Sequence, residues 1–471
     1  MAGRGLGKWG RGVTVGAIAC AGFPLALLPS WADTLEGALV QAYQNNPSLN
    51  SQRASVRVTD ENVPQALSGY RPKVNINGSI GTQNWDTTNK TSTTNPTYIQ
   101  QSGTMTPNSY GITATQTLYN GFQTANKTRQ AESQVQAARE TLRVTEQTVL
   151  LSAVTAYMNL LRDSAILDLQ RRNVEVLQEQ LRQTRDRFNV GEVTRTDVAQ
   201  SESRLASGRS QVLNAEANYK ASVATYRQVI GVEPGKLSPG SPVDRFSPRD
   251  VPQSIGVATA THPAVTSAQY NVDAALLQVK VAEGALYPTL SVQGNVLQSN
   301  EIGLLQLKSF NAAVLGQLSV PIYQGGAEYS LIRQAKETLG QRRLDLDTAR
   351  DQVRQTVVQS WGQLDAAKAN IEATQANVQA SEIALNGVRE EARVGQRTTL
   401  DVLNAQQELV NARVSLVTAQ RDRVVASYTL LSAVGRLSPQ ILGLHVPTYD
   451  SNVHYQQVRD TWAGVRTPDG R

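Results

Sequence analysis

The sequence predicts a mixed α/β fold that is built twice, from two copies of a unit with two amphipathic strands and one long helical hairpin. Segment 190–198 (VGEVTRTDV) returns 204 positions later as segment 394–402 (VGQRTTLDV). The same offset aligns Gly231 with Gly435, while earlier landmarks, among them Pro72 and Pro288, align at an offset of 216. A period this long indicates two copies of one structural unit rather than an array of short repeats.

Composition excludes several classes of function. The 471 residues include 45 Lys and Arg against 39 Asp and Glu, but the basic residues are scattered, without the dense basic and aromatic cluster of a nucleic-acid site. There is no Gly-rich phosphate loop, no cluster of metal ligands and no nucleophile beside a base. We therefore expect no enzymatic activity, no cofactor, no metal and no nucleic-acid partner.

The N-terminus has the pattern of a secretory signal peptide, residues 1–32. Three basic residues precede the apolar stretch 13–28, and Ser30-Trp31-Ala32 supplies the small residues of a cleavage site. An N-terminal membrane anchor is the alternative. Cys20, the single cysteine, lies in a segment with partial similarity to a lipoprotein cleavage box; cleavage after Ala32 would leave the mature chain without cysteine.

The first repeat is predicted over 33–231. A helical pattern runs from Thr34 to about residue 69, with Asp33 as its N-cap. Strands are expected at about 72–85 and 110–120, because apolar residues alternate there with small polar ones. The polar stretch between these strands, from about 85 to 108, is expected to be a loop. A helical hairpin follows at about 122–231, with apolar residues seven apart on both helices.

The second repeat is predicted over 254–436, after a linker at 232–253. It has a helix at about 255–286, strands at about 288–298 and 310–323, and a helical hairpin at about 326–435. The C-terminal tail, 437–471, is polar, and we expect it to be poorly ordered.

The strand lengths determine the predicted architecture. About ten residues suffice for a tilted strand to cross the hydrocarbon of a bilayer, where strand edges are not tolerated. Four strands cannot close into a barrel, since single-chain barrels have at least eight strands. A trimer would supply twelve strands, continued by twelve long helices around a water-filled tube. We therefore predict a mixed α/β membrane protein: a trimeric 12-stranded β-barrel joined to a 12-helix α-barrel of coiled-coil hairpins.

The two repeated turns, together with segments 403–406 (LNAQ) and 323–326 (YQGG), resemble the TolC outer-membrane efflux family. The resemblance covers Asp33 to about Leu437. It implies a homotrimer in the Gram-negative outer membrane, in contact with its lipid, with a helical extension through the periplasm. It also implies a periplasmic adaptor and an inner-membrane transporter of ABC or RND type as partners. The implied function is an exit duct for type I protein secretion or multidrug efflux; the sequence does not choose between them.

The resemblance also suggests functional residues at the hairpin tips. In the family the tips close the periplasmic end and receive the adaptor. The corresponding docking residues here are Val190, Gly191, Glu192, Val394, Gly395, Gln396 and Arg397. For the two glycines, the alternative is that each only supplies the positive φ needed to end a helix.

A pore constriction is expected next to the tips. Its candidate residues are Asp401, Asp197, Thr196, Asn404 and Arg397. A ring of carboxylates at a narrow neck concentrates cations, although an Asp near a helix N-terminus can equally serve only to stabilise that helix. Asn404 and Ala392 stand where the family often has an acidic residue and an aromatic latch. We therefore expect weaker cation selectivity and a looser closure, with Arg397 paired to an Asp of a neighbouring hairpin.

A trimeric coiled-coil fibre or adhesin of the cell surface is the alternative from another class. Its helices would also be long and would carry heptads. The hairpin turns and the four amphipathic strands in the middle of the chain favour the channel.

Overall fold

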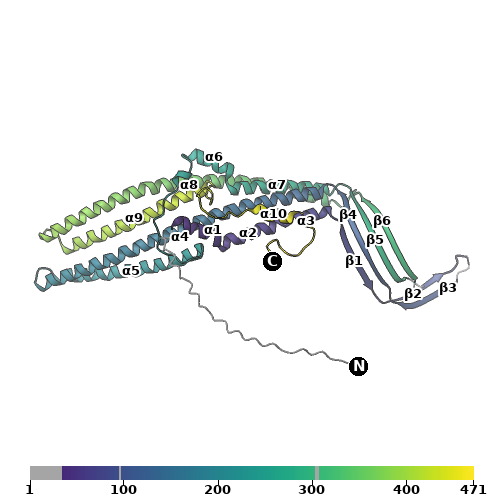
Figure 1. Cartoon of the computed structure of the whole chain (residues 1–471), viewed down its shortest axis with the longest axis horizontal. Coiled ribbons are helices and arrows are strands. Elements are labelled where there is room, and N and C mark those ends of the chain that lie inside the picture. Colours follow the sequence, from purple (N-terminus) through teal and green to yellow (C-terminus); the bar gives the residue numbers. More distant parts are fainter. Residues whose placement is uncertain (1–33, 95–96, 303–306, 471) are drawn as a thin grey trace, which may run out of the picture.

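The computed structural model describes residues 34–94, 97–302 and 307–470 (Figure 1). The predicted signal peptide, Cys20 and Asp33 lie outside these residues. Long helices extend to one side of an elongated molecule and a sheet forms its other end (Figure 1). The helices are α1 (Leu35–Asn45), α2 (Pro47–Asp60), α3 (Asn62–Leu67), α4 (Gln123–Asn189), α5 (Arg195–Ile230), α6 (Val251–Thr261), α7 (Pro263–Gly284), α8 (Ala327–Arg393), α9 (Thr399–Ala433) and α10 (Ser451–Arg459). The strands are β1 (Lys73–Ile80), β2 (Gln83–Lys90), β3 (Tyr98–Met105), β4 (Asn108–Asn120), β5 (Thr289–Ile302) and β6 (Leu307–Ser319).

Four antiparallel strands form the main sheet in the order β1-β4-β5-β6. The central pair, β4 and β5, joins the first half of the chain to the second, so neither half forms this sheet alone. The strand β5 extends to Ile302, beyond the expected end near 298. The strand β6 begins at Leu307 and ends at Ser319, two residues before Pro321, which lacks the N–H that a ladder requires.

The prediction of a polar loop between the first two strands is wrong. Residues 83–90 and 98–105 pair as an antiparallel ribbon, β2 and β3, which projects beyond the main sheet (Figure 1). The side chain of Trp85 lies over Gly103, where an added Cβ would be 3.6 Å from the indole ring. The segment is polar because a two-stranded ribbon has no core to fill, and its Thr-rich alternation is compatible with extended backbone.

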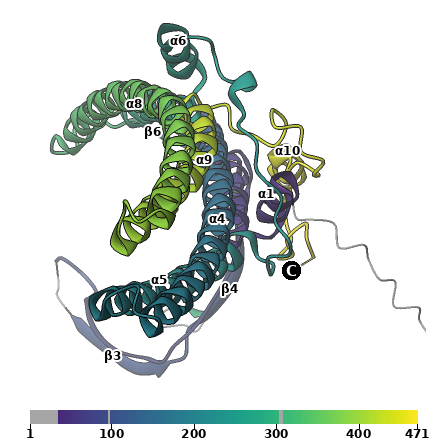
Figure 2. The same cartoon turned by 90° about the vertical axis from the view of Figure 1, so that its left-hand side faces the viewer.

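The four longest helices form two hairpins, α4 with α5 and α8 with α9. Viewed towards the hairpin ends, the long helices follow an arc, with α1 and α10 on its convex side (Figure 2). Most heptad positions of α4 are buried, among them Val135, Leu142 and Leu160, whereas Phe188 next to the tip is 42% exposed. The helices α4 and α9 also contact each other, which places the two hairpins side by side. Among the described residues no helix is both long and apolar enough to cross a bilayer.

The two shorter helical segments are each interrupted at an X–Pro step, where the sequence predicted one continuous helix. Asn46 separates α1 from α2, and His262 separates α6 from α7; both have extended backbone, with ψ of 121° and 128°. A residue before proline is disfavoured in helical geometry, and proline is well placed as the first residue of the next helix. The N-cap of α1 is Thr34, whose hydroxyl accepts from Gly37 N. The helix α6 begins at Val251, inside the expected linker, because Asp250 caps it.

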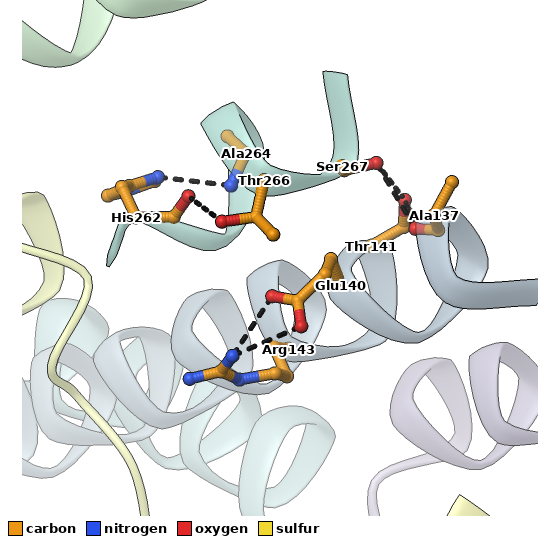
Figure 3. A network of polar contacts seen from close by, with 8 residues as sticks. All are labelled: Ala137, Glu140, Thr141, Arg143, His262, Ala264, Thr266 and Ser267. Carbon is orange, nitrogen blue, oxygen red and sulfur yellow. Dashed lines mark hydrogen bonds and ion pairs between the residues drawn. The ribbon is translucent and has the colours of Figure 1, made fainter. Parts of the chain in front are cut away.

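At the break, His262 caps the helix α7, and the first turns of α7 contact α4 of the first repeat (Figure 3). The ring atom Nδ1 of His262 accepts from the backbone N–H of Ala264 at 3.1 Å. One turn later the Ser267 hydroxyl donates to the carbonyl of Ala137 on α4 at 3.1 Å. Burial lowers the pKa of His262, and the nearby Arg143 acts in the same direction against a hydrogen bond with the Ser432 backbone. The histidine therefore caps α7 as a neutral ring.

The C-terminal tail is ordered, which corrects the sequence-based expectation. Residues 451–459 form α10, which packs on α2 and α3. Leu437 is buried in the core, and Leu442, Leu444, Val446 and Tyr449 pack against that core. The helix α10 is held by contacts with helices some 300 to 400 positions earlier in the chain, such as His454 with Asp60 and Arg139 with Asn452.

Candidate functional site

Both hairpins turn with the same backbone hydrogen bonds. In the first, Gly191 N donates to Phe188 O at 3.0 Å and Glu192 N to Arg187 O at 2.9 Å. In the second, Gly395 N donates to Ala392 O at 3.2 Å and Gln396 N to Glu391 O at 2.9 Å. This is the Schellman arrangement, which ends a helix on a left-handed residue.

The two glycines are required by backbone geometry. Their φ values are +83° for Gly191 and +81° for Gly395. A Cβ at either position would meet no atom within 4 Å. The backbone, and not close packing, thus excludes other residues, so the helix-ending interpretation accounts for both glycines.

The valines before the glycines have no such explanation. Val190 and Val394 are the C-cap residues of α4 and α8, and each is 72% exposed. Two apolar side chains at the outermost point of the molecule gain nothing from the fold of one chain. They make the tips candidate surfaces for a partner.

A capping box follows each turn. Thr194 and Thr398 are the N-caps of α5 and α9, and Asp197 and Asp401 occupy the third helical position. In the second tip, Asp401 Oδ2 accepts from Thr398 N at 3.0 Å and from Thr398 Oγ1 at 2.9 Å. These bonds, the backbone one first, lower the pKa of Asp401, and Arg397 adds to the effect. Each carboxylate is therefore held at a fixed position and satisfies the start of its own helix.

An ion pair spans each turn. Arg187 Nε lies 3.0 Å from Glu192 Oε2 in the first tip. In the second, Arg397 Nε lies 2.8 Å from Glu391 Oε2, with the order of the charges along the chain reversed. Arg397 therefore has an ion-pair partner within its own hairpin, and its pairing with an Asp of a neighbouring hairpin stays a prediction. Thr196, the second residue of α5, and Gln396 are exposed.

One predicted neck residue connects the two hairpins. Arg204 Nη2 on α5 donates to Asn404 Oδ1 on α9 at 2.6 Å. Nearby, Gln406 Nε2 of α9 donates to Asn173 Oδ1 of α4 at 3.5 Å. Both bonds tie the second hairpin to the first within one chain.

A buried leucine accompanies these polar ties. Leu403 of α9 is 3% exposed and packs against residues of the first hairpin, Leu177, Leu181 and Leu205. Sequence reasoning missed Arg204, Gln406 and Leu403 as hairpin contacts. Periodicity describes the stripe within one hairpin, and no signal in a single sequence pairs residues about 200 positions apart.

The sheet at the opposite end has one apolar and one polar face. The strand register places on one face Val74, Ile76, Gly78, Ile80, Tyr110, Ile112, Ala114, Leu290, Val292, Gly294, Val296, Phe310, Ala312, Val314, Gly316 and Leu318, with Asn108, Gln116, Gln298 and Asn300 as polar members. The other face carries mostly Asn, Ser, Thr and Gln. Many apolar side chains are exposed, with Ile76 at 80% and Val314 at 78%. Such a large exposed apolar face calls for an apolar environment.

Comparison with known proteins decides the family. The outer membrane efflux protein family matches residues 38–232 and 255–436, which contain both hairpins and the main sheet. The chain belongs to this family. The two matched segments are separated at the linker before α6.

Individual relatives extend over nearly the whole chain. The outer membrane efflux protein BepC of Brucella suis biovar 1 is 43% identical over 456 residues, 97% of each chain. The outer membrane protein TolC of Escherichia coli K12 is 26% identical and covers 88% of this chain and 84% of its own. The crystal structure of the outer membrane protein VceC from Vibrio cholerae has the same fold, with a TM-score of 0.71 at 19% identity, covering 85% of this chain and 96% of that one.

Protease secretion proteins are also among the relatives. The protein is thus an outer-membrane channel protein for efflux or type I secretion, located in the Gram-negative outer membrane with a periplasmic extension.

Proposed function

We propose that three copies of this chain assemble around one axis into a closed duct. The observation that carries this proposal is the four-stranded sheet with one apolar face and two outer strands, β1 and β6. In lipid, unpaired edges are not tolerated, so β6 of one copy pairs with β1 of the next. Three sheets close a twelve-stranded barrel, with the apolar face towards lipid and the polar face towards the lumen. The hairpins continue it as a tube of twelve helices in the periplasm.

The hairpin tips are the periplasmic neck of this duct. Asp401 and Asp197 contribute one carboxylate each per chain, so that a trimer carries them as two rings. The capping boxes keep these carboxylates from swinging away, and the lowered pKa keeps Asp401 anionic. Thr196, Asn404 and Arg397 lie at the same end of the hairpins. The neck is weakly cation-selective, because Arg204 and Arg397 lie among its acidic groups.

Opening of the neck separates the second hairpin from the first. The ties that must break are Arg204–Asn404 and Gln406–Asn173, and Leu403 must leave its site between α4 and α5. The Arg204–Asn404 bond is exposed, so that solvent can replace it at small cost. Asn173 and Leu403 are each 3% exposed, so that opening also brings buried groups into water, and release of the closed state requires a partner.

A periplasmic adaptor supplies the energy of opening by binding the tips. Its docking surface is formed by the turn residues Val190, Gly191, Glu192, Val394, Gly395, Gln396 and Arg397. The two valines, each 72% exposed, offer the apolar contacts. An inner-membrane transporter of ABC or RND type delivers the protein or drug that leaves through the duct. A surface fibre is not favoured, because its helices would need no apolar sheet face.

The proposal is tested by the conductance of the mature protein in planar bilayers. We expect discrete channels, and we expect Asp401→Asn to shift the reversal potential in a salt gradient towards lower cation selectivity. Asparagine keeps an acceptor oxygen for Thr398, so that the capping geometry is retained while the charge is lost. Asp250→Asn is the matched control, since Asp250 caps α6 by accepting from Gln253 N at 2.7 Å, far from the tips.

The outcomes separate the parts of the proposal. Absence of channels from every reconstituted protein would overturn the duct. Channels whose selectivity is unchanged by Asp401→Asn would retain the duct and remove Asp401 from its neck.

A further inference from the structure

The C-terminal tail contacts the body of the protein through α10 and through the residues that directly follow it. His454 Nδ1 lies 3.0 Å from Asp60 Oδ2, and the Asp60 side chain is fully buried. Arg139 of α4 donates through Nη1 to Asn452 Oδ1 at 2.7 Å, and its guanidinium lies 5.2 Å from the ring centre of Tyr455. These contacts fix the direction in which the chain leaves α10.

Beyond α10 the tail reaches the junction between helices and sheet. Arg71 Nη1 donates to Thr461 O at 2.7 Å, and the Arg71 guanidinium lies 4.7 Å from the ring centre of Trp462. Arg71 is two residues before β1 and directly follows Tyr70, whose carbonyl accepts from Gln116 Nε2 of β4 at 3.0 Å. Trp462 is therefore held at the level where the strands begin.

The position of Trp462 is unusual for a side chain of its size. It is 73% exposed, although a tryptophan indole loses much by facing water. The tail lies with α10 on the convex side of the arc of helices, away from the side that would enclose a lumen (Figure 2). Other exposed aromatic side chains occur at the same junction: Tyr70, Phe122, Tyr287 and Tyr323.

We infer that the C-terminal tail is a strap that presents Trp462 to the phospholipid headgroup region on the periplasmic side of the outer membrane. The indole is suited to this region because its ring is apolar and its N–H can donate to headgroups or water. Arg71 supports it in two ways: it stacks on the indole, and it carries further N–H donors that match lipid phosphate. The inference rests on the proposed placement of the sheet in the membrane, and it adds a contact made by a segment outside the barrel.

The tail is suited to anchoring because it is separate from the strands. Membrane insertion of the strands is determined by the apolar face of the sheet, whereas the strap is attached by Asp60, Arg139 and Arg71 on the periplasmic side. It resists tilting of the helical tube relative to the membrane, since Trp462 lies outside the barrel wall while α10 is packed on α2 and α3.

Fluorescence quenching by lipid tests this inference. In the mature chain Trp85→Phe and Trp361→Phe leave Trp462 as the single tryptophan. The protein is reconstituted into vesicles of phosphatidylethanolamine and phosphatidylglycerol brominated either close to the headgroup or close to the chain ends. We expect Trp462 emission to be blue-shifted, to lose intensity with the shallow bromines more than with the deep ones, and to resist iodide in the buffer. Adding Arg71→Gln should reverse this and increase iodide quenching.

A second probe separates failure of the strap from failure of the membrane placement. Val314→Trp, as the single tryptophan, reports the centre of β6 and should be quenched most by the deep bromines. If Val314→Trp is quenched while Trp462 responds only to iodide, or to neither quencher, the strap is overturned and the barrel stands. If bromine quenches neither probe, the membrane placement itself is wrong.

Discussion

Thr398 and Asp401 hold each other through three hydrogen bonds. Asp401 Oδ2 accepts from Thr398 N at 3.0 Å and from its hydroxyl at 2.9 Å, and Asp401 N donates to Thr398 Oγ1 at 3.2 Å. Thr194 and Asp197 repeat the arrangement in the first hairpin. The residue proposed for the neck therefore also starts a helix, so that a variant there can change both charge and structure.

We predict that Thr398→Ala loosens the first turn of α9. Loss of an N-cap hydroxyl costs about 0.5–2 kcal/mol, and here the backbone N–H of Asp401 would lose its side-chain acceptor. Hydrogen exchange of the amides of 399–402 should accelerate, while exchange in the first turn of α5 should stay unchanged. Thr194→Ala should show the converse. Equal exchange in both turns for both variants would contradict independent capping boxes.

We predict that Arg204→Ala favours the open neck. The variant removes the 2.6 Å bond to Asn404 that ties the two hairpins within a chain. Single-channel recordings should show a higher open probability. Arg185→Ala is the matched control, because Arg185 pairs with Glu202 of the same hairpin at 2.6 Å. Similar gating in the two variants would show that the bond between hairpins does not hold the neck closed.

We predict that neighbouring residues of β6 differ sharply in their tolerance of a charge. Val314 lies on the apolar face and Ala313 on the polar face. A lysine facing lipid near the bilayer centre costs about 2–4 kcal/mol, whereas one facing a lumen stays hydrated. Val314→Lys should reduce the yield of heat-resistant trimer on gels, and Ala313→Lys should not. The opposite order would mean that the faces are reversed.

We predict that His262 makes stability depend on pH. Burial lowers its pKa in the folded chain below the usual value of about 6.5. The unfolded chain then binds more protons, so that the histidine's contribution is complete above about pH 6.5 and is lost as pH falls through the folded pKa. The melting temperature of the wild type should therefore decrease from about pH 8 to about pH 5.5 more than that of His262→Asn.

Asparagine is a suitable replacement for His262, because the chain uses it at the equivalent position. Asn46 Oδ1 accepts from Ser48 N at 3.0 Å and from Leu49 N at 3.2 Å before Pro47. The His262→Asn variant should thus keep the cap of α7 without a titrating group. An identical pH dependence in the wild type and the variant would assign the effect to other groups.

Regular patterns in the sequence were sufficient to predict the long helices. The seven-residue spacing of apolar residues predicted a helical hairpin from about residue 122 to 231, and α4 and α5 span Gln123–Asn189 and Arg195–Ile230. The turn residues could be recognised because Gly191 and Gly395 need positive φ and each following Thr and Asp complete a capping box. Such features depend on residues within a few positions of one another, which a single sequence displays directly.

Other features required the folded chain. The polar ribbon β2–β3 lacks the apolar face that marks a buried strand, and the nine residues of α10 are too short a segment for periodicity to predict a helix. The helix α10 is held by distant partners, His454 with Asp60 and Asn452 with Arg139. The same holds at the tips, where Arg204 meets Asn404 and Leu403 enters the first hairpin. The sequence by itself determined the repeat, the long hairpin helices, their turns and the two faces of the four strands of the main sheet. Only tertiary packing decided which residues 200 to 400 positions apart contact each other. The reason is that a local sequence pattern does not indicate which side chain of another element a residue will contact.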